Sequence, residues 1–187
     1  MTTRPDSWRA ARDLVKQRGY HRRDEPFTLA SGKQSHDYID GKYAIDRGDR
    51  LTLVATAVAE LAAANGIEYD AVGGLTMGAD PLAIGVAVVT GKHWFSVRKA
   101  RKERGHNQWV EGSRLRDETM RVLLVDDVVS TGGSILQAHR HVTDDGGVVT
   151  AAIPMVDRGE SAAKLFAELG IPYLPLMTYA DLGIEPI

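Results

Sequence analysis

The sequence predicts an α/β fold in which a central, mostly parallel sheet is flanked by helices. Short apolar segments that read as strands alternate with longer segments of helical periodicity along most of the chain, and this alternation is typical of parallel βαβ units. No internal repeat or low-complexity linker interrupts the 187 residues, so we expect a single domain over 1–187. Sheets of this kind bind ligands at the carboxyl ends of their strands.

The N-terminal quarter is predicted to hold one helix and two short extended segments. Asp6 or Ser7 can cap the helix, whose apolar residues recur at helical spacing from Trp8 to Val15. The extended segments cover 27–29 and 37–39.

The rest of the chain alternates between the two kinds of element, with one exception. The predicted elements are helix 51–64, strand 70–74, helix 81–89, strand 94–97, strand 121–125, helix 134–144, strand 148–156, helix 160–169 and strand 173–176. The exception is 99–118, which is very polar and has no apolar periodicity. A polar loop of this length inside a compact domain is typically functional, so we expect a mobile loop there.

The composition excludes several classes of function. The net charge of −2 argues against a nucleic acid or an anionic membrane as partner. The chain has no cysteine, which rules out disulfides, thiol nucleophiles and zinc–thiolate sites and fits a reducing compartment. The first residues are polar, and no apolar run approaches the roughly 20 residues that cross a bilayer. We therefore expect a cytoplasmic protein without a membrane partner.

The stretch VLLVDDVVSTGGS, residues 122–134, combines a buried strand with a polar turn. Val122–Val125 reads as a central strand buried on both faces, and Asp126 and Asp127 emerge at its carboxyl end. The run Ser130–Ser134 then turns into a helix. A turn of small residues at a helix N-terminus presents backbone N–H groups and the positive end of a dipole. This arrangement predicts a cradle for a monophosphate.

The two carboxylates suit a different part of the ligand from the phosphate, because like charges repel. Carboxylates bind sugar hydroxyls or a cation, so the stretch favours a sugar phosphate, with magnesium as a candidate ion. The plainer alternative is a strand cap and a helix cap without any ligand. Another alternative is a magnesium phosphatase or receiver domain that uses Asp126 and Asp127, but the turn fits it poorly and no third carboxylate partner is evident in the sequence.

The same stretch resembles the phosphoribosyl-diphosphate (PRPP) binding signature of type I phosphoribosyltransferases. The resemblance implies that the paired acids contact the ribose hydroxyls and that the loop holds the 5′-phosphate. It implies Mg²⁺ as cofactor, carried by the PRPP diphosphate without a direct protein ligand. It also implies the type I phosphoribosyltransferase fold, with a small N-terminal hood over 1–45 and a flexible catalytic loop over 99–118. The implied PRPP-binding residues in this stretch are Asp126, Asp127, Val128, Val129, Ser130, Thr131, Gly132, Gly133 and Ser134.

Four further segments resemble the orotate phosphoribosyltransferases. They are VRKARKERG with WVEG at 97–112, FTLASGK at 27–33, GGLTMGADPLA at 73–83 and DRG at 157–159. The resemblance implies transfer of the phosphoribosyl group from PRPP to orotate, giving orotidine 5′-monophosphate and diphosphate in pyrimidine biosynthesis. It also implies a homodimer in which the loop of one subunit reaches the site of the other.

Residues 98–104 carry five cations in seven positions. On charge patterning alone they could be a solvated run or a nucleic-acid patch, but a polyanionic substrate fits the acidic balance of the chain better. Cations on a mobile loop can neutralise a leaving diphosphate after closing over it. The resemblance assigns Arg98, Lys99, Lys102 and Arg104 to PRPP binding. It makes Lys102 catalytic, together with Asp126 and Asp127, and places Lys102 in the partner subunit's site.

The base pocket is predicted around Arg158, at the end of a strand. Arginine holds carboxylates through two parallel hydrogen bonds, and orotate carries a carboxylate. The resemblance suggests that backbone groups at Tyr38 and Ile39 and the Ser130 hydroxyl complete the pocket. Without that context, a surface salt bridge would be the simpler interpretation of Arg158.

Three positions depart from the family pattern. Arg104 stands where the family places a loop histidine, Ala30 where many members have a lysine, and Thr76-Met77 where some have an aromatic–lysine pair. These departures allow either an enzyme with a modified acceptor or a divergent branch of the same enzyme. Two alternatives therefore stay open. One is a PRPP-dependent enzyme for a purine or a modified pyrimidine, and the other, which the five loop cations support, is a PRPP-sensing regulator that binds RNA. Outside the motifs, His139 and His141 are expected to be solvated, and Trp109 is expected to cover the closed site.

Overall fold

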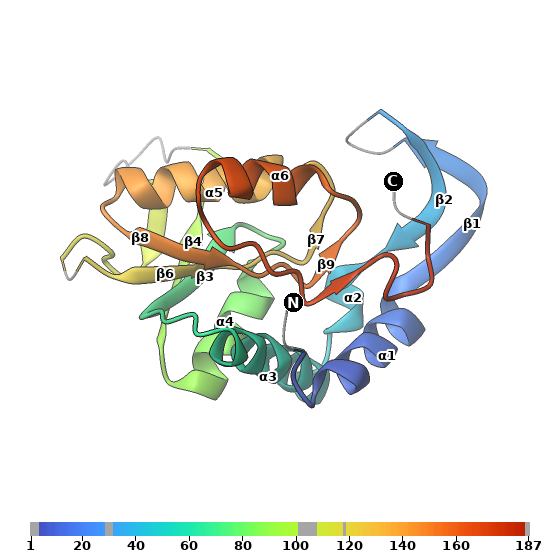
Figure 1. The fold of residues 1–187 in the computed structure, drawn as a ribbon, viewed down its shortest axis with the longest axis horizontal. Coiled ribbons are helices and arrows are strands. Elements are labelled where there is room, and N and C mark those ends of the chain that lie inside the picture. Colours follow the sequence, from blue (N-terminus) through green and yellow to red (C-terminus); the bar gives the residue numbers. More distant parts are fainter. Residues whose placement is uncertain (1–3, 29–31, 101–107, 118, 186–187) are drawn as a thin grey trace.

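The protein is an α/β structure built on a five-stranded, mostly parallel sheet (Figure 1). The computed structural model describes residues 4–28, 32–100, 108–117 and 119–185. In spatial order the strands are β5 (Val110–Gly112), β4 (His93–Val97), β3 (Ala71–Leu75), β6 (Arg121–Leu124) and β8 (Val148–Ala152). β5 runs antiparallel to β4, and the other neighbours are parallel. The predicted fold class is confirmed.

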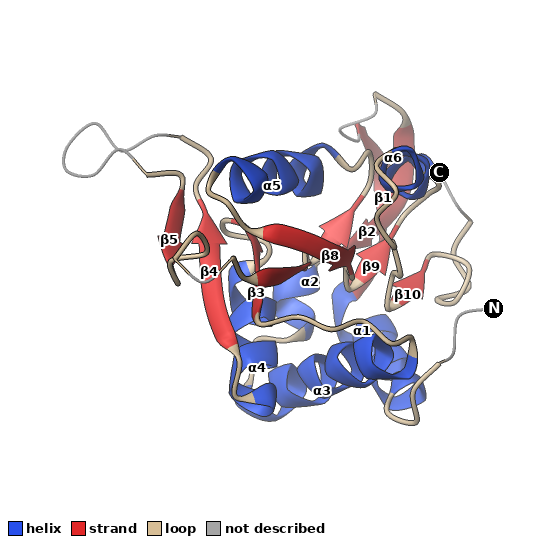
Figure 2. Ribbon diagram, turned by 60° about the vertical axis from the view of Figure 1, so that its left-hand side comes forward, coloured by secondary structure: helices blue, strands red, loops and turns tan. Residues whose placement is uncertain are grey.

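Helices cover both faces of this sheet (Figures 1 and 2). α5 (Gly133–Asp144) and α6 (Ser161–Glu168) lie on one face, and α3 (Gly48–Ala64) and α4 (Asp80–Thr90) lie on the other. The side chains of β6 alternate between the two layers. Val122 and Leu124 pack with α5 and α6, whereas Leu123 packs with α3 and α4, and all three are fully buried. The apolar run that predicted a doubly buried strand is thus explained by two separate cores.

The N-terminal part forms a hood beside the carboxyl edge of the sheet. It consists of α1 (Trp8–Gly19), β1 (Tyr20–Thr28), β2 (Gln34–Ile39) and α2 (Gly41–Ala44), with β1 and β2 paired antiparallel. The hairpin stands apart from the main sheet (Figure 1). β1 therefore contains residues 27 and 28 of the first predicted extended segment, whose residue 29 lies outside the described residues, and β2 contains the whole of 37–39. Ser7 precedes α1 as predicted, but its hydroxyl donates to the Glu60 carboxylate (2.5 Å) and does not cap the helix.

The predicted strand over 148–156 is divided in the structure. β8 ends at Ala152, and β9 (Val156–Asp157) joins a second parallel sheet between β7 (Val128–Val129) and β10 (Met177–Thr178). Pro154 lies in the break, where its missing N–H cannot donate to a neighbouring strand.

Two further predictions need correction. The segment expected as strand 173–176 makes only a bridge, between Tyr173 and Ala152, and the strand itself follows as β10. The polar segment 99–118, expected to be a loop throughout, contains the short strand β5. Within the described residues, none of the helices is both long enough and apolar enough to cross a membrane.

Candidate active site

Two adjacent carboxylates follow β6 within two or three residues of its end, and their environments differ. Asp126 is 6% exposed, and its Oδ1 accepts the backbone N–H of Asp127 at 3.0 Å. The Oδ1 of Asp127 accepts the backbone N–H of Val128 at 2.8 Å. Burial, reinforced by the negative charge of Asp127, raises the pKa of Asp126 to about 8. Asp126 therefore tends to keep its proton until a ligand or a cation favours its charged form.

The predicted phosphate cradle is a small hollow at the start of α5. It has a volume of about 130 Å³ and is lined by Asp126, Val128, Val129, Ser130, Thr131, Gly132, Gly133, Ser134 and Ile135. The N-terminus of α5 has no side-chain cap, and the first N–H groups of a helix have no acceptor within it. These donors, together with the dipole of a twelve-residue helix, suit a phosphate dianion.

Gly132 is required by the shape of this turn. Its φ of 84° lies in the left-handed region, where a side chain is strained. A Cβ at this position would also lie 3.0 Å from both Cα and Cβ of Ala162 on α6. The glycine in the sequence motif thus serves both the turn and the close packing of α6 behind it.

A second hollow of about 170 Å³ adjoins the cradle and shares Asp126, Val128 and Ser134 with it. Its other lining residues are Lys42, Leu75, Thr76, Gly78, Lys99 and Asp127. Two carboxylates and two ammonium groups therefore face the same space. Lys42, from α2 of the hood, places its Nζ 2.9 Å from Oδ2 of Asp127. Lys42 could not be identified from the sequence, because no local motif marks it and only the fold brings α2 to the acidic pair.

The predicted loop cations are divided between this site and its surroundings. Lys99 lines the hollow at the acidic pair and also a neighbouring pocket of about 510 Å³ with Arg98. In that pocket, Nη1 of Arg98 lies 3.4 Å from Oε1 of Glu111, so Arg98 pairs with β5. Lys102 and Arg104 fall outside the described residues.

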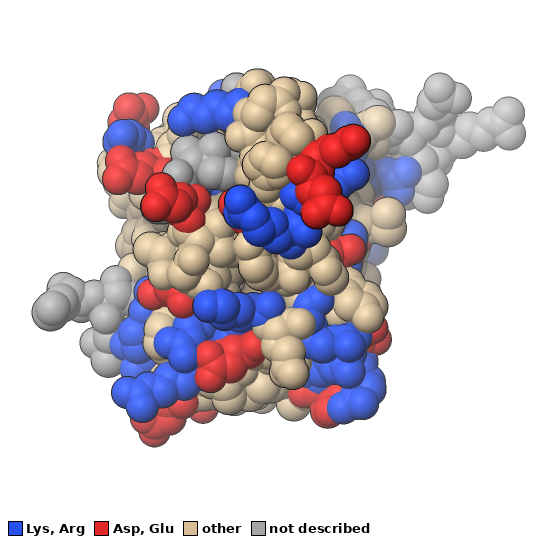
Figure 3. Space-filling model, turned by 90° about the vertical axis from the view of Figure 1, so that its right-hand side faces the viewer, with Lys and Arg blue, Asp and Glu red and all other residues tan. Residues whose placement is uncertain are grey.

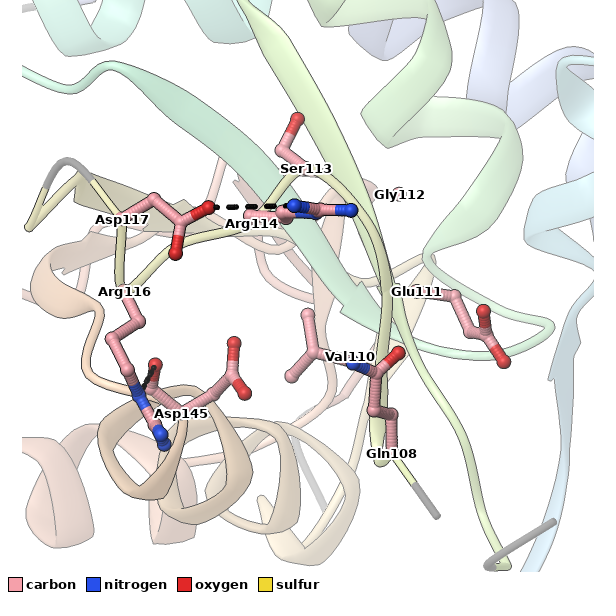
Figure 4. A pocket seen from close by; sticks show the side chains of 9 residues that line it. All are labelled: Gln108, Val110, Glu111, Gly112, Ser113, Arg114, Arg116, Asp117 and Asp145. Carbon is pink, nitrogen blue, oxygen red and sulfur yellow. Dashed lines mark hydrogen bonds and ion pairs between the residues drawn. The ribbon is translucent and has the colours of Figure 1, made fainter. Parts of the chain in front are cut away.

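A pocket of about 470 Å³ lies beyond β5 and is lined by none of the predicted site residues (Figure 4). Its two arginines already have partners, and its Glu111 is the residue that pairs with Arg98. Arg114 faces Asp117 at 3.8 Å, and Arg116 donates to the backbone carbonyls of Asp144 and Asp145. A large volume alone therefore does not identify the site, whereas the convergence of the motif residues does.

Arg158 links the end of β9 to the hood. Its Nε donates to the hydroxyl of Tyr179, and its Nη2 donates to the backbone carbonyl of Asp37 at 3.1 Å. Tyr179 is 1% exposed, and burial raises the pKa of its hydroxyl, so the tyrosine stays neutral and orients the guanidinium. A guanidinium has five N–H donors, so donors remain for a ligand.

The predicted base-pocket residues of the hood lie close to Arg158. The carbonyl that Arg158 contacts belongs to the residue before Tyr38. The ring of Phe27 lies 6.0 Å from the guanidinium carbon, and it meets the Tyr38 ring edge-on with centroids 5.6 Å apart. Ile39 is buried, whereas Tyr38 is 39% exposed. Ser130, the remaining predicted member, lines the cradle.

Comparison with known proteins agrees with this geometry. Residues 45–165 match the family described as phosphoribosyl transferase domain. The orotate phosphoribosyltransferase of Pyrococcus furiosus is 38% identical over 156 residues, which cover 83% of this chain and 85% of that protein. The Mycobacterium leprae orotate phosphoribosyltransferase is 39% identical over 159 residues, which cover 84% of this chain and 87% of that protein.

A solved structure extends the similarity to the fold. The Mycobacterium tuberculosis orotate phosphoribosyltransferase in complex with PRPP has a TM-score of 0.78 and 34% identity, covering 96% of this chain and 100% of that one. The family match spans the acidic pair, the cradle, Lys99 and Arg158, and the relatives extend over most of the chain. The chain belongs to the phosphoribosyl transferase family, among the orotate phosphoribosyltransferases.

Proposed function

We propose that this protein transfers the 5-phosphoribosyl group of PRPP to orotate, giving orotidine 5′-monophosphate and diphosphate in pyrimidine biosynthesis. The observation that carries the proposal is the position of Arg158. Its backbone N–H donates to the carbonyl of Val129, at the start of the phosphate loop (2.9 Å), while its side chain reaches the hood. A carboxylate-binding group thus stands directly beside a sugar-phosphate site, as a carboxylated pyrimidine requires.

In this proposal each group has one task. The cradle at α5 holds the 5′-phosphate, and Asp126 and Asp127 accept hydrogen bonds from the ribose hydroxyls. Departure of diphosphate leaves positive charge on the ribose ring, as in glycoside chemistry, and the two carboxylates at the ribose hydroxyls stabilise that charge. Arg158 and the hood strand β2 hold orotate so that its deprotonated ring nitrogen attacks the ribose carbon from which diphosphate has departed. Arg98, Lys99 and the loop residues Lys102 and Arg104 neutralise the departing diphosphate.

Magnesium is the cofactor that this donor set fits. Among the described residues, no three His, Asp or Glu side chains gather into a metal site. Mg²⁺ is commonly held through substrate phosphates and needs few protein ligands, so the diphosphate of PRPP would carry the ion beside the acidic pair without a direct protein ligand. When bound, the ion would add positive charge at the diphosphate.

We also propose a homodimer in which Lys102 acts in the neighbouring site. Support comes from an apolar surface on α4 and β4, where Ile84, Val88 and Trp94 are 41%, 76% and 44% exposed. Exposed apolar side chains of this size suit an interface between subunits. The cytoplasmic location expected from the composition stays a prediction.

The alternatives are separated by the acceptor and by charge. A purine offers no carboxylate to Arg158, so the arginine favours orotate. An RNA-binding regulator would need a basic surface, whereas basic and acidic side chains are interspersed over the face that carries the hood (Figure 3). Both alternatives stay testable by the same assay.

The test is the loss of orotate absorbance in a mixture of purified protein, PRPP and Mg²⁺, compared with uracil, adenine and hypoxanthine as acceptors. We expect rapid Mg²⁺-dependent loss of orotate alone, which collapses in a Lys102→Ala variant. Turnover of another base in place of orotate would overturn the acceptor assignment. Binding of PRPP without turnover of any base would favour the regulator.

A further inference from the structure

We propose that Lys42 is a further PRPP-binding residue, whose ammonium leaves Asp127 and contacts the diphosphate when the substrate enters. The inference rests on the proposed function and adds a hood residue to the diphosphate site. It begins from a contact between distant parts of the chain, the ion pair of Lys42 Nζ with Asp127 Oδ2 at 2.9 Å.

The backbone fixes Lys42 at the acidic pair. The Asp40 carboxylate accepts the backbone N–H of Tyr43 at 3.0 Å and so caps α2. A Cβ at Gly41 would lie 2.9 Å from Cβ of Asp127, so only glycine lets α2 approach this closely. Lys42 follows directly and lines the 170 Å³ hollow together with Lys99.

Stability does not explain this placement. The side chain of Lys42 is 54% exposed, and an ion pair with one solvated partner contributes little to folding because water screens it. The ion pair raises the pKa of the Lys42 ammonium, which therefore keeps its charge at neutral pH. Its exposed stem leaves the ammonium free to change partners within the hollow.

The geometry of PRPP explains what that change would be. Asp127, 13% exposed, faces the hollow where a ribose would present its hydroxyls. The diphosphate is attached to the carbon beside the 2-hydroxyl, so a sugar that engages Asp127 brings the diphosphate to the same hollow. An ammonium displaced from its carboxylate then finds phosphate oxygens within reach, and charge-assisted hydrogen bonds are the strong ones.

The competing explanation is that Lys42 only orders Asp127. Ribose 5-phosphate separates the two, because it carries the ribose hydroxyls and the 5′-phosphate but no diphosphate. If Lys42 only orders Asp127, removal of the lysine side chain lowers the affinity for both ligands alike. If Lys42 binds the diphosphate, removal of the lysine side chain lowers the affinity for PRPP alone.

The experiment measures the affinity of Lys42→Met for PRPP and for ribose 5-phosphate by calorimetry, both with Mg²⁺. We expect PRPP to bind about tenfold more weakly, with ribose 5-phosphate within about twofold of the wild type. Lys42→Arg, which keeps the charge, should restore most of the PRPP affinity. Lys92→Met is the matched control. Lys92 lies directly before β4, at the opposite edge of the sheet, and its ammonium donates to the backbone carbonyl of Tyr69.

In turnover, Lys42→Met should raise the KM for PRPP while the KM for orotate stays within about twofold. Equal weakening of both calorimetric ligands, or no weakening of either, would overturn the inference. The binding measurement needs no acceptor base, so it stands apart from the proposed function. If the wild-type protein does not use orotate, but Lys42→Met still binds PRPP more weakly than the wild type, the assignment of orotate as acceptor is refuted. The assignment of Lys42 to the PRPP site then stands.

Discussion

Asp126 and Asp127 are neighbours in sequence, yet the fold gives them opposite electrostatic surroundings. Asp127 faces a hollow and pairs with Lys42, whereas Asp126 is 6% exposed and lies beside a second negative charge. Substrate hydroxyls and positive charge at the site favour the ionised form of both acids. At neutral pH the buried Asp126 therefore tends to stay protonated until a ligand binds. The amount by which it lowers the free energy of unfolding of the empty protein depends on pH.

Asp126→Asn should stabilise the empty protein at alkaline pH. Folding raises the pKa of Asp126 from 3.8 to about 8, so between these values the folded state binds more protons than the unfolded state. The wild type's free energy of unfolding therefore falls as pH rises through this window and levels above it. Urea unfolding should show that the stability advantage of the variant over the wild type grows by several kcal/mol between about pH 5 and about pH 9. An equal difference at both pH values would contradict the assigned burial.

Arg158→Lys should separate binding of orotate from binding of PRPP. Lysine keeps the positive charge but loses the planar fork that holds a carboxylate through two hydrogen bonds. We expect the KM for orotate to rise roughly thirtyfold, a loss of about 2 kcal/mol, because one charge-assisted hydrogen bond disappears. Affinity for PRPP, measured by calorimetry, should stay within about twofold of the wild type. A parallel loss of PRPP affinity would place Arg158 in the phosphate site instead.

At the scale of elements, the sequence was most informative where the signal is local. The strand at Val122–Val125 could be predicted because a strand buried on both faces is a continuous run of apolar residues. The helix after Gly132 could be predicted because glycines in the sequence mark the turn before it. The break at Pro154 was missed because an apolar run conceals a change of sheet. Lys42 could not be predicted, since its role depends on contact between residues 85 positions apart.

The histidines of α5 show the same limit. His139 and His141 were expected to be solvated, but the ring of His141 stacks on Trp109 with centroids 4.0 Å apart, and that of His139 meets Phe166 edge-on. Trp109 therefore packs on α5 in this structure, and its position over the closed site stays a prediction. Spacing along one helix gave the directions of the two rings but not the neighbours that arrive from other elements.

Gly132→Ala tests the turn that begins α5. Alanine at a φ of 84° is strained, and its Cβ would also press on Ala162 of α6. We expect a loss of stability of about 2 kcal/mol by urea unfolding and an affinity for ribose 5-phosphate at least tenfold weaker. Gly170→Ala is the matched control, because Gly170 has a φ of 69° with open space around it. Comparable loss of ligand affinity in both variants would mean that strain, and not the cradle, is responsible.

At the scale of the whole molecule, the exposed apolar residues Ile84, Val88 and Trp94 and the proposed catalytic loop both suit a dimer as the functional unit. α4 begins at Asp80, directly after the turn that contributes Thr76 and Gly78 to the hollow at the acidic pair, so the helix starts beside the site. Residues 101–107 lie between β4, which carries the exposed Trp94, and β5. A partner bound on this surface would bring two sites and two loops together, as the proposed action of Lys102 requires.

Val88→Asp should therefore remove both the dimer and the activity. Val88 is 76% exposed, so a charge there leaves the core intact while it disfavours an apolar interface. Light scattering after gel filtration should give the monomer mass for this variant and twice that mass for the wild type. Leu169→Asp, at a 43% exposed position beyond α6, is the control that should stay dimeric and active.

Mixing inactive Lys102→Ala with inactive Asp127→Asn should restore part of the turnover, since a mixed dimer would contain one site with an intact acidic pair and an intact incoming loop. A wild type that is monomeric and fully active would refute the arrangement in trans.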